Sequence, residues 1–589
     1  MRRFVLGLFA AIGVVGVLAI IGVSAAVWWV VASRPTLPRS MVLSVDFGRG
    51  FVEGPNQSPI SELAFGKKQT LHGFLDALER AGADARVKGL YARFSGDSLA
   101  VATGQEVRDA IEAFRAKGKF AIAFADSFGE FGGGTRPYYI ATAFDEIWLQ
   151  PMGEVGLVGL RSEAAFFRGT LDKLGILPRF EHREEYKTAA NSLTETGMTA
   201  PQREELEDLL GSISGQVVRG IAHARNLSED QVASLIDRGP FSAEEAKAAH
   251  LIDRIGHRDE AVTRTHERAG SGAVEVSLSR YLDGAGRPHD DSGPKIALIY
   301  GTGLIGAGDG SGSLAGDNEM SAREMTRAFR QAVRDSAVRA ILFRIDSPGG
   351  SAVASETIWR EVVFARERGK PVIVSMGDVA GSGGYYVAAP ADKIVAEPAT
   401  LTGSIGVLAG KLVVEQLLQK LGITTDSVQR GANAGMFSAL QDFSPEARQR
   451  LDAFLDQTYR GFKEHVAAGR HLSPDQVEAV AKGRVWTGEE AKAKGLVDEL
   501  GGYSVALRLT LDAAKVPADK PFRVAVFPRE KSTAELIYDR LAKTDNDDEV
   551  GQPGALQRAF AALDMIAAHI DALTGDSVVL RMMPIGEVR

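Results

Sequence analysis

The sequence predicts an α/β fold: two tandem copies of one domain with mostly parallel sheets, preceded by an N-terminal transmembrane helix. Three observations support this prediction. Short apolar segments typical of buried strands alternate with helical segments. Segments of the first half recur in the second half at a nearly constant spacing. An uncharged apolar run lies close to the N-terminus.

Composition excludes several classes of function. The chain has 589 residues, more than one ordinary domain, and its 45% apolar and 24% charged content is that of a folded protein. A formal net charge of -8 argues against a nucleic-acid partner. There is no cysteine and no HExxH motif, so disulfides and thiolate catalysis are excluded. We therefore expect neither a metal nor a cofactor.

The apolar run at residues 4–31 predicts a membrane anchor, which we assign to residues 1–34. It exceeds the ~20 residues that span a bilayer, whereas a cleavable signal has a core of about 7–15. Paired arginines before it favour a cytoplasmic N-terminus, and two tryptophans near its end suit the opposite interface. A long signal peptide cleaved near residue 25 is the alternative. In either case the remaining chain is exported.

Two homologous domains follow the anchor. Five matches between the halves keep a spacing of 247 residues: Tyr138 with Tyr385, Asp145 with Asp392, Pro151 with Pro398, Gly156 with Gly403 and Gly175 with Gly422. We assign residues 35–269 to the first domain and 295–510 to the second. Residues 270–294, rich in Gly, Ser and Asp and without helical periodicity, are expected to be a linker. Residues 511–589 form a C-terminal segment of unknown role.

The second copy shows the alternation of elements most clearly. Its strands are predicted at 295–300, 340–345 and 371–375, and its helices at 320–334 and 355–368. Such an order favours a mostly parallel sheet covered by helices.

Ser382 is the candidate nucleophile. It lies between Gly381 and Gly383 in a predicted strand–turn–helix connection, a geometry that presents a hydroxyl to a carbonyl group. No histidine lies between His289 and His465, so a base for Ser382 must come from elsewhere in the chain.

Glycines near Ser382 are candidate donors to an oxyanion. The N–H of Gly383 follows the nucleophile, and Gly349 or Gly350, in the run DSPGGS at 346–351, can supply a second one. A plain Pro-Gly-Gly turn is the alternative explanation for that run. The first copy has Thr135 at the position of Ser382 and lacks the paired glycines, which favours the catalytic interpretation.

Three motifs together resemble signal peptide peptidase A in its long form, a bacterial family of membrane-anchored serine proteases. They are DSPGGS at 346–351, AGSGGYY at 380–386 and LTGSIG at 401–406. The anchor and the tandem halves also match, so the resemblance covers most of the chain up to about residue 510. It implies two crotonase/Clp-protease-like domains.

The resemblance also implies a Ser–Lys dyad. Ser382 matches the family's nucleophile, Lys187 in a Tyr-Lys pair matches its base, and Ser404 matches a serine that orients the lysine. A lysine beside several charged residues is by itself more typical of a solvated surface. As a base it must be neutral, and this requires burial, because its ordinary pKa is ~10.4. Lys393 and Lys411 are nearer to Ser382 in sequence and compete for this role.

The expected function is that of a serine endopeptidase that degrades cleaved signal peptides and other apolar peptides. The resemblance implies a homotetramer in the bacterial inner membrane, anchored in lipid by the N-terminal helix, with the catalytic part on the periplasmic side. Two alternatives are a crotonase-type acyl-CoA enzyme, whose fold also holds an oxyanion with paired glycine amides, and a non-catalytic membrane scaffold.

Overall fold

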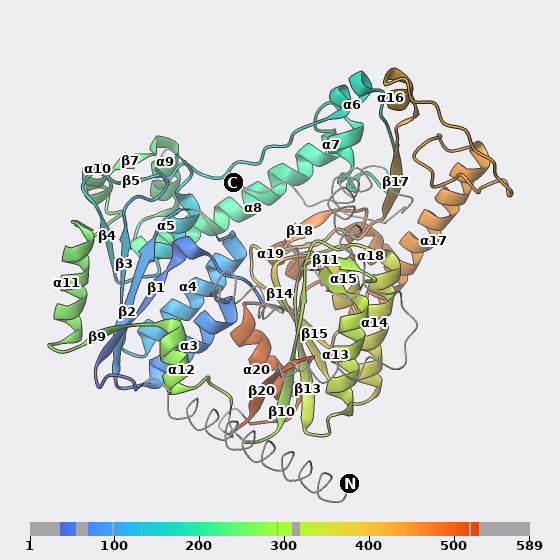
Figure 1. The fold of residues 1–589 in the computed structure, drawn as a ribbon. Helices are drawn as coiled ribbons and strands as arrows, with labels where there is room; N and C mark the ends of the chain where they lie inside the picture. The colour runs from blue at the N-terminus through green and yellow to red at the C-terminus, as the bar shows by residue number, and fades with distance from the viewer. Residues whose placement is uncertain are drawn as a thin grey trace, which may run out of the picture.

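The computed structural model describes residues 36–54, 69–96, 99–130, 132–290, 292–308, 319–517 and 520–528. These residues form two α/β units that lie next to each other (Figure 1). The expected anchor at residues 1–34 lies outside them. None of the helices in the described ranges is long and apolar enough to cross a bilayer.

The first sheet is entirely parallel, with the strand order β8-β4-β3-β2-β1-β9. Every residue of β3 is buried, as expected for a parallel strand that is covered on both faces. The strands are β1 (Met41–Asp46), β2 (Val87–Phe94), β3 (Phe120–Ala125), β4 (Glu146–Leu149), β8 (Arg254–Ile255) and β9 (Val274–Ser277).

The second sheet repeats this order as β19-β15-β14-β13-β10-β20. β14 is long enough to pair with β15 along its first part and with β16 along its last part. β18 then adds to β16 as an antiparallel strand. The strands are β10 (Lys295–Thr302), β13 (Val338–Ser347), β14 (Val372–Gly381), β15 (Lys393–Ala396), β16 (Leu401–Gly403), β18 (Val485–Thr487), β19 (Glu499–Leu500) and β20 (Arg523–Phe527).

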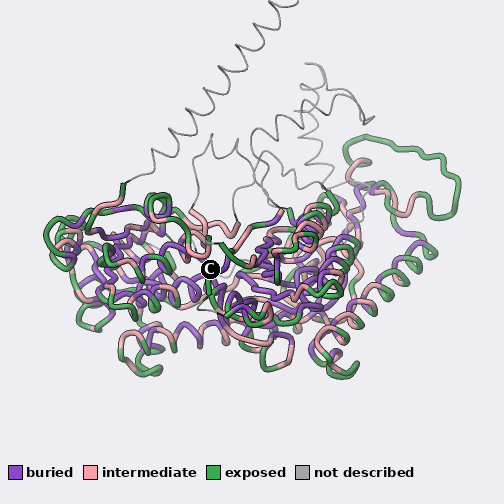
Figure 2. Tube along the Cα trace, turned by 90° about the horizontal axis from the view of Figure 1, so that it is seen from below, coloured by how far each residue is buried: buried purple, intermediate pink, exposed green. Residues whose placement is uncertain are grey.

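Helices cover both faces of each sheet. In the first unit, one core contains residues of α3, α4 and α12, while α11 packs on the opposite face. The second unit has α13 and α14 on one face and α20 on the other. Figure 2 shows the buried segments concentrated inside the two units. The helices are α3 (Leu71–Ala83), α4 (Val101–Ala116), α11 (Arg258–Ala269), α12 (Leu278–Ala285), α13 (Ala322–Arg334), α14 (Ala352–Glu367) and α20 (Tyr503–Ala513).

The two units are joined by more than the chain that connects them. β6 (Leu177–His182) of the first half pairs antiparallel with β17 (Leu408–Val413) of the second. Buried Arg344 of β13 forms ion pairs with Glu53 at 2.8 Å and with Glu106 at 2.7 Å, both from the first half. Side chains of either half can therefore contribute to one site.

The predicted alternation of elements is confirmed, and all five elements predicted for the second copy are present. Residues 270–294 differ from the expected linker without helical structure, because they include β9 and α12. Leu278, Tyr281 and Leu282 of α12 are buried, a helical i, i+3, i+4 spacing that the surrounding glycines obscure. The C-terminal segment after residue 510 supplies the end of α20 and all of β20.

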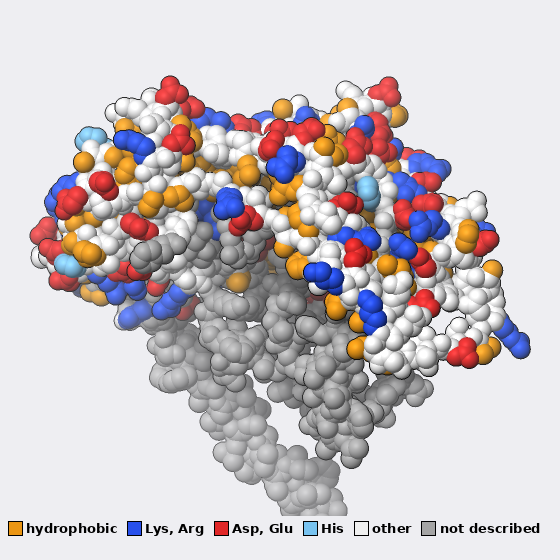
Figure 3. Space-filling view, turned by 90° about the horizontal axis from the view of Figure 1, so that it is seen from above, with side chains coloured by type: hydrophobic (Ala, Val, Ile, Leu, Met, Phe, Trp, Pro, Cys, Tyr) orange, Lys and Arg blue, Asp and Glu red, His pale blue; other side chains and the backbone are white. Residues whose placement is uncertain are grey.

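The surface is of mixed charge where it is seen in Figure 3. Lys and Arg side chains alternate there with Asp and Glu side chains, and hydrophobic side chains lie between them. That face therefore presents no extended field of one sign.

Candidate active site

Ser382 occupies the turn between β14 and the short helix α15 (Gly383–Ala388), as the sequence predicts. Its backbone has φ 49° and ψ -112°, a conformation that costs a non-glycine residue about 1–3 kcal/mol. Two hydrogen bonds hold it there: the Ser382 N–H donates to Gly403 O at 2.8 Å, and Ser382 O accepts from Tyr386 N–H at 2.7 Å. The turn thus fixes the direction of the hydroxyl.

Lys187 reaches this hydroxyl from the first half. It follows β6 and precedes α8 (Ala200–Arg225), and its side chain is only 1% exposed. Its Nζ lies 3.1 Å from Ser382 Oγ and donates to Ser404 O at 2.9 Å and to Ser404 Oγ at 3.0 Å. Because Ser404 Oγ itself donates to Gly483 O at 3.3 Å, it acts as an acceptor toward the amine. Two hydrogens of a neutral amine are thus directed to Ser404, and its lone pair can face Ser382.

Burial also favours the neutral amine. Removal from water lowers the pKa of Lys187 to about 7, and the negative charge of Glu205 partly opposes this shift. Burial likewise raises the pKa of Glu205 to about 7, against the opposing effects of the Val485 N–H and of nearby positive charges. Glu205 lies on α8, and its Oε1 accepts the N–H of Val485 at 2.6 Å.

The two competing lysines lie at other places. Lys393 is largely exposed and pairs with Asp498 at 3.2 Å. Lys411 donates to the carbonyl oxygens of Met436, Ser438 and Gln441 at 2.8–2.9 Å. Each has a structural partner of its own, and the amine within reach of Ser382 is that of Lys187.

The candidate oxyanion donors can now be distinguished. The N–H of Gly349 donates to Ser347 Oγ at 3.2 Å. Ile305 bonds to Gly349 O and to the N–H of Ser351, so the intervening Gly350 turns its own N–H away from Ile305. A Cβ placed on Gly383 would lie 3.1 Å from Gly350 N, which places this N–H beside the turn. The geometry favours Gly350 with Gly383.

Glycine is required at these positions by close packing. Gly350 has φ +155°, and a Cβ there would lie 2.2 Å from Ile305 O. A Cβ on Gly384 would lie 2.6 Å from Ser347 O. At both positions the neighbouring backbone therefore lies closer than any side chain would permit.

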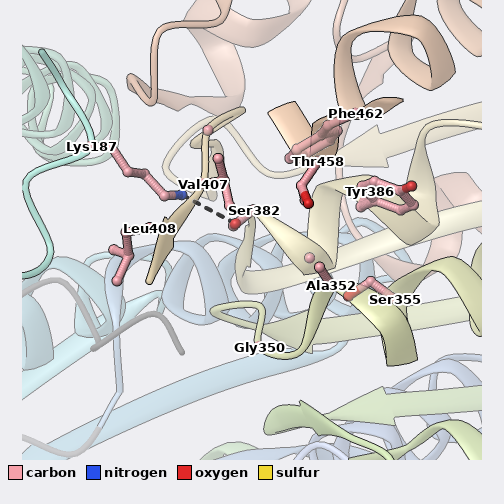
Figure 4. Close-up of a pocket in the computed structure, with 12 residues that line it drawn as sticks. Lys187, Gly350, Ala352, Ser355, Ser382, Tyr386, Val407, Leu408, Thr458 and Phe462 are labelled. Atoms are coloured by element: carbon pink, nitrogen blue, oxygen red, sulfur yellow. Dashed lines mark hydrogen bonds between the residues drawn. The ribbon is translucent and has the colours of Figure 1, made fainter. Parts of the chain in front are cut away.

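A pocket opens beside Ser382 and Lys187 (Figure 4). The space within it and in front of it is about 380 Å³ and is partly open to solvent. Most of its wall consists of apolar side chains and glycines, and the hydroxyls of Ser355 and Thr458 are polar groups in this wall. The lining residues are Lys187, Gly350, Ala352, Ser355, Ser382, Gly383, Tyr386, Gly406, Val407, Leu408, Thr458 and Phe462.

Sequence reasoning missed several of these residues. Thr458 and Phe462 lie on α17 (Pro445–Arg470), far from every motif. Gly483, which packs against Lys187, was also missed. A Cβ on Gly483 would lie 2.6 Å from Lys187 N, so the lack of a side chain at this position makes room for the lysine. A long amphipathic helix after the last motif was the available signal for α17; nothing in the sequence marked Gly483.

Comparison with known proteins identifies related chains. The sequence profile of Peptidase family S49 matches residues 113–271 and 365–516, one range in each half. "Serine protease SPPA, chloroplastic" of Arabidopsis thaliana is 32% identical over 472 residues, which covers 79% of this chain and 69% of that protein. "Protease 4" of Salmonella typhi is 29% identical over 524 residues, covering 87% and 82%.

Solved structures match less than half of the chain, with low TM-scores. A membrane-bound stomatin-specific protease with a substrate peptide is 16% identical, has a TM-score of 0.26, and is matched over 43% of this chain and 99% of that one. A ClpP1 mutant from Listeria monocytogenes is 16% identical with a TM-score of 0.23, over 36% and 94%. The sequence matches, which span both halves, show that this chain belongs to Peptidase family S49 and is a serine peptidase.

Proposed function

We propose that this chain is a membrane-anchored endopeptidase that degrades cleaved signal peptides, with Ser382 as nucleophile and Lys187 as base. One observation carries the proposal: the buried Lys187 Nζ lies 3.1 Å from Ser382 Oγ, within hydrogen-bonding reach. Ser404 holds the amine from the other side and orients it.

The reaction follows from this geometry. Neutral Lys187 accepts the proton of Ser382 as Oγ bonds to the scissile carbonyl carbon, and the carbonyl oxygen becomes an oxyanion. The N–H groups of Gly350 and Gly383 stabilise that charge. The Lys187 ammonium then gives its proton to the leaving amine nitrogen, and the C–N bond breaks to leave an acyl-enzyme.

Deacylation uses the same groups. Lys187, neutral again, accepts a proton from a water molecule as the water oxygen attacks the acyl carbon. Collapse of the second oxyanion breaks the bond to Ser382 Oγ, and the proton returns from Lys187 to the serine oxygen. The dyad needs no acidic residue as a third member, because Ser404 orients the base.

Apolar peptides suit the pocket. Val407, Leu408, Phe462 and Tyr386 present apolar surface next to Ser382. An apolar substrate segment buried there gains roughly 25 cal/mol per Å² removed from water. This supports signal peptides, whose central part is apolar, as the substrate class.

The proposal includes the place of the enzyme. The apolar run at 4–31, outside the described residues, supports a single anchor in the bacterial inner membrane with the catalytic units on the periplasmic side. The family resemblance supports a homotetramer. An anchored enzyme meets cleaved signal peptides where they are released.

Two substitutions test the proposal. Ser382→Ala and Lys187→Ala are each expected to lower hydrolysis of an apolar peptide by at least ~10³-fold without unfolding the protein, because each removes a reacting group. Lys393→Ala is the control, since that side chain is exposed and does not line the pocket. Retained hydrolysis by purified Lys187→Ala would refute the dyad, and coenzyme A binding would favour an acyl-CoA enzyme instead.

A further inference from the structure

Strand β14 contains an irregularity just before the nucleophile. Ile345 of β13 pairs with Met376, and Ser347 pairs with Ala380. Between these two pairs β13 has one residue, whereas β14 has the three residues 377–379, which form a bulge. The corresponding strands of the first half, β2 and β3, pair without any such shift. Bulges of this kind occur often next to active sites, where they redirect side chains.

Asp346 holds this bulge in place from β13. Its Oδ1 accepts the N–H of Val379 at 3.0 Å. On the other side, the hydroxyl of Thr400 donates to Gly377 O at 2.7 Å. A Cβ on Gly377 would lie 3.1 Å from Asp346 Cβ, so the bulge lies directly against the carboxyl side chain.

Asp378, at the centre of the bulge, points into the first half. Its Oδ1 accepts the N–H of Thr103 at 2.8 Å, and its Oδ2 accepts the Thr103 hydroxyl at 2.8 Å. Thr103 lies in the first turn of α4, whose N-cap residue is Ala100 and has no side-chain cap. The carboxyl of Asp378 thus serves as the missing cap of a helix in the other half.

Both aspartates adjoin the residues of the proposed site. Asp346 immediately precedes the run of Ser347 to Gly350, and Asp378 lies four residues before Ser382. The bulge therefore connects the N-terminus of α4 with the strand ends that present Ser382 and the two oxyanion donors.

Asp346 and Asp378 share two charged neighbours. Glu53 and Arg344 act on both, and Arg344 is itself bound by Glu53 and Glu106. Burial raises the pKa of Asp346 to about 7, with Asp378 as the next cause, and burial raises the pKa of Asp378 as well. Each carboxyl is held by hydrogen bonds of its own, Asp346 by the N–H of Val379 and Asp378 by Thr103.

We propose that Asp378 and Asp346 are positioning residues of this serine peptidase: they fix the bulge at 377–379 so that α4 of the first half sets the position of Ser382, Gly350 and Gly383 in the second. This inference rests on the proposed function. It assigns a catalytic consequence to a contact between the halves that lies behind the pocket and touches no substrate.

The test uses the full chain and steady-state hydrolysis of an apolar peptide. Asp378→Ala removes the cap, Asp378→Asn keeps an acceptor for the Thr103 N–H, and Thr103→Val removes only the hydroxyl. Asp392→Ala is the matched control: Asp392 also accepts a strand N–H, that of Val372 at 2.8 Å, and pairs with Arg366, but it does not reach the first half. Rates are compared per folded molecule, well below the melting temperature of each variant.

We expect Asp378→Ala to lower kcat by ~10–100-fold with KM nearly unchanged, because small displacements of reacting groups cost rates of that order. Asp378→Asn should restore most of kcat, Thr103→Val should lower it by a few-fold (~3–10), and Asp392→Ala should leave it unchanged. The double variant of Thr103→Val and Asp378→Ala should be no slower than Asp378→Ala alone.

The outcomes separate the two proposals. If Ser382→Ala is inactive while Asp378→Ala keeps the wild-type kcat, the positioning role is refuted and the proposed function stands. If Ser382→Ala remains active, the proposed function itself fails. If Asp378→Ala does not fold, Asp378→Asn and Thr103→Val decide: wild-type kcat in both refutes the positioning role, and a kcat loss in Thr103→Val alone supports it.

Discussion

The two halves share one topology and differ at the residues of the proposed site. Thr135 begins α5 (Thr135–Ala141) after β3, where Ser382 precedes α15 after β14. The Thr135 hydroxyl donates to Gly159 O at 3.0 Å and accepts the N–H of Gly159 at 3.1 Å, so it is engaged within its own half. Ser382 faces the lysine of the other half.

The lysine shows the reverse difference. Lys187 is buried between the halves, while Ala434, its counterpart at the same spacing, lies exposed in a turn. One copy thus provides the amine and the other the hydroxyl with its glycines. In this duplicated fold the interface between the copies, and not either sheet alone, brings the two groups of the proposed site together.

After the loss of Ser382 or Lys187 themselves, the largest effect should come from Gly350, a glycine of the second half. Gly350→Ala is expected to lower kcat by ~10²–10³-fold, because its Cβ would lie 2.2 Å from Ile305 O and would displace one oxyanion donor. Peptide kinetics and a circular dichroism spectrum measure this. Gly133→Ala in the first half, where a Cβ meets nothing within 4 Å, is the control. Full activity of Gly350→Ala would exclude its N–H from the site.

The pH profile tests the buried base. Since burial lowers the pKa of Lys187 to about 7, the neutral amine is lost as the pH falls below that value. The rate constant kcat/KM should therefore fall about tenfold per pH unit below about 7 and level off above it. The profile is measured between pH 5 and 9 on protein whose folding is verified at each pH. A profile that still rises through pH 9 would mean that Lys187 keeps an ordinary pKa.

Ser404→Ala should have a smaller effect on the same base. It removes the Oγ acceptor at 3.0 Å but leaves the Ser404 carbonyl, so Lys187 keeps one of the two orienting contacts. We expect kcat to fall by ~10-fold, as for the loss of one good hydrogen bond. Ser355→Ala, which removes a different hydroxyl from the pocket wall, provides the comparison. Equal losses in both variants would contradict a specific orienting role for Ser404.

Thr135→Ala should have the smallest effect. It removes the two hydrogen bonds to Gly159 from the first half and should lower the free energy of unfolding by about 1 kcal/mol. Hydrolysis should be unchanged, because this hydroxyl belongs to the half without oxyanion donors. Urea denaturation measures the stability. A large loss of kcat would show that the first copy takes part in chemistry through its own turn.

Much of the fold could be predicted because its signals are local. Buried strands such as β13 and β14 contain short apolar runs, and these alternate with helical segments along the second half. Local sequence patterns did not predict short elements that depend on contacts with other parts of the fold. α12 and β20 are weak by pattern, and they are ordered through packing on α3 and pairing with β10.

The sequence by itself determined the duplicated α/β topology and singled out Ser382 as the candidate nucleophile, since turns, glycines and apolar periodicity act over a few residues. Only the tertiary structure decided that Lys187 lies beside Ser382, 195 positions away in the chain, and that Lys393 and Lys411 do not. It also decided the burial that lowers the pKa of this amine. The physical reason is that desolvation and hydrogen-bond geometry are properties of packed neighbours, here Ser404 and Gly483, and these come together only in the folded chain.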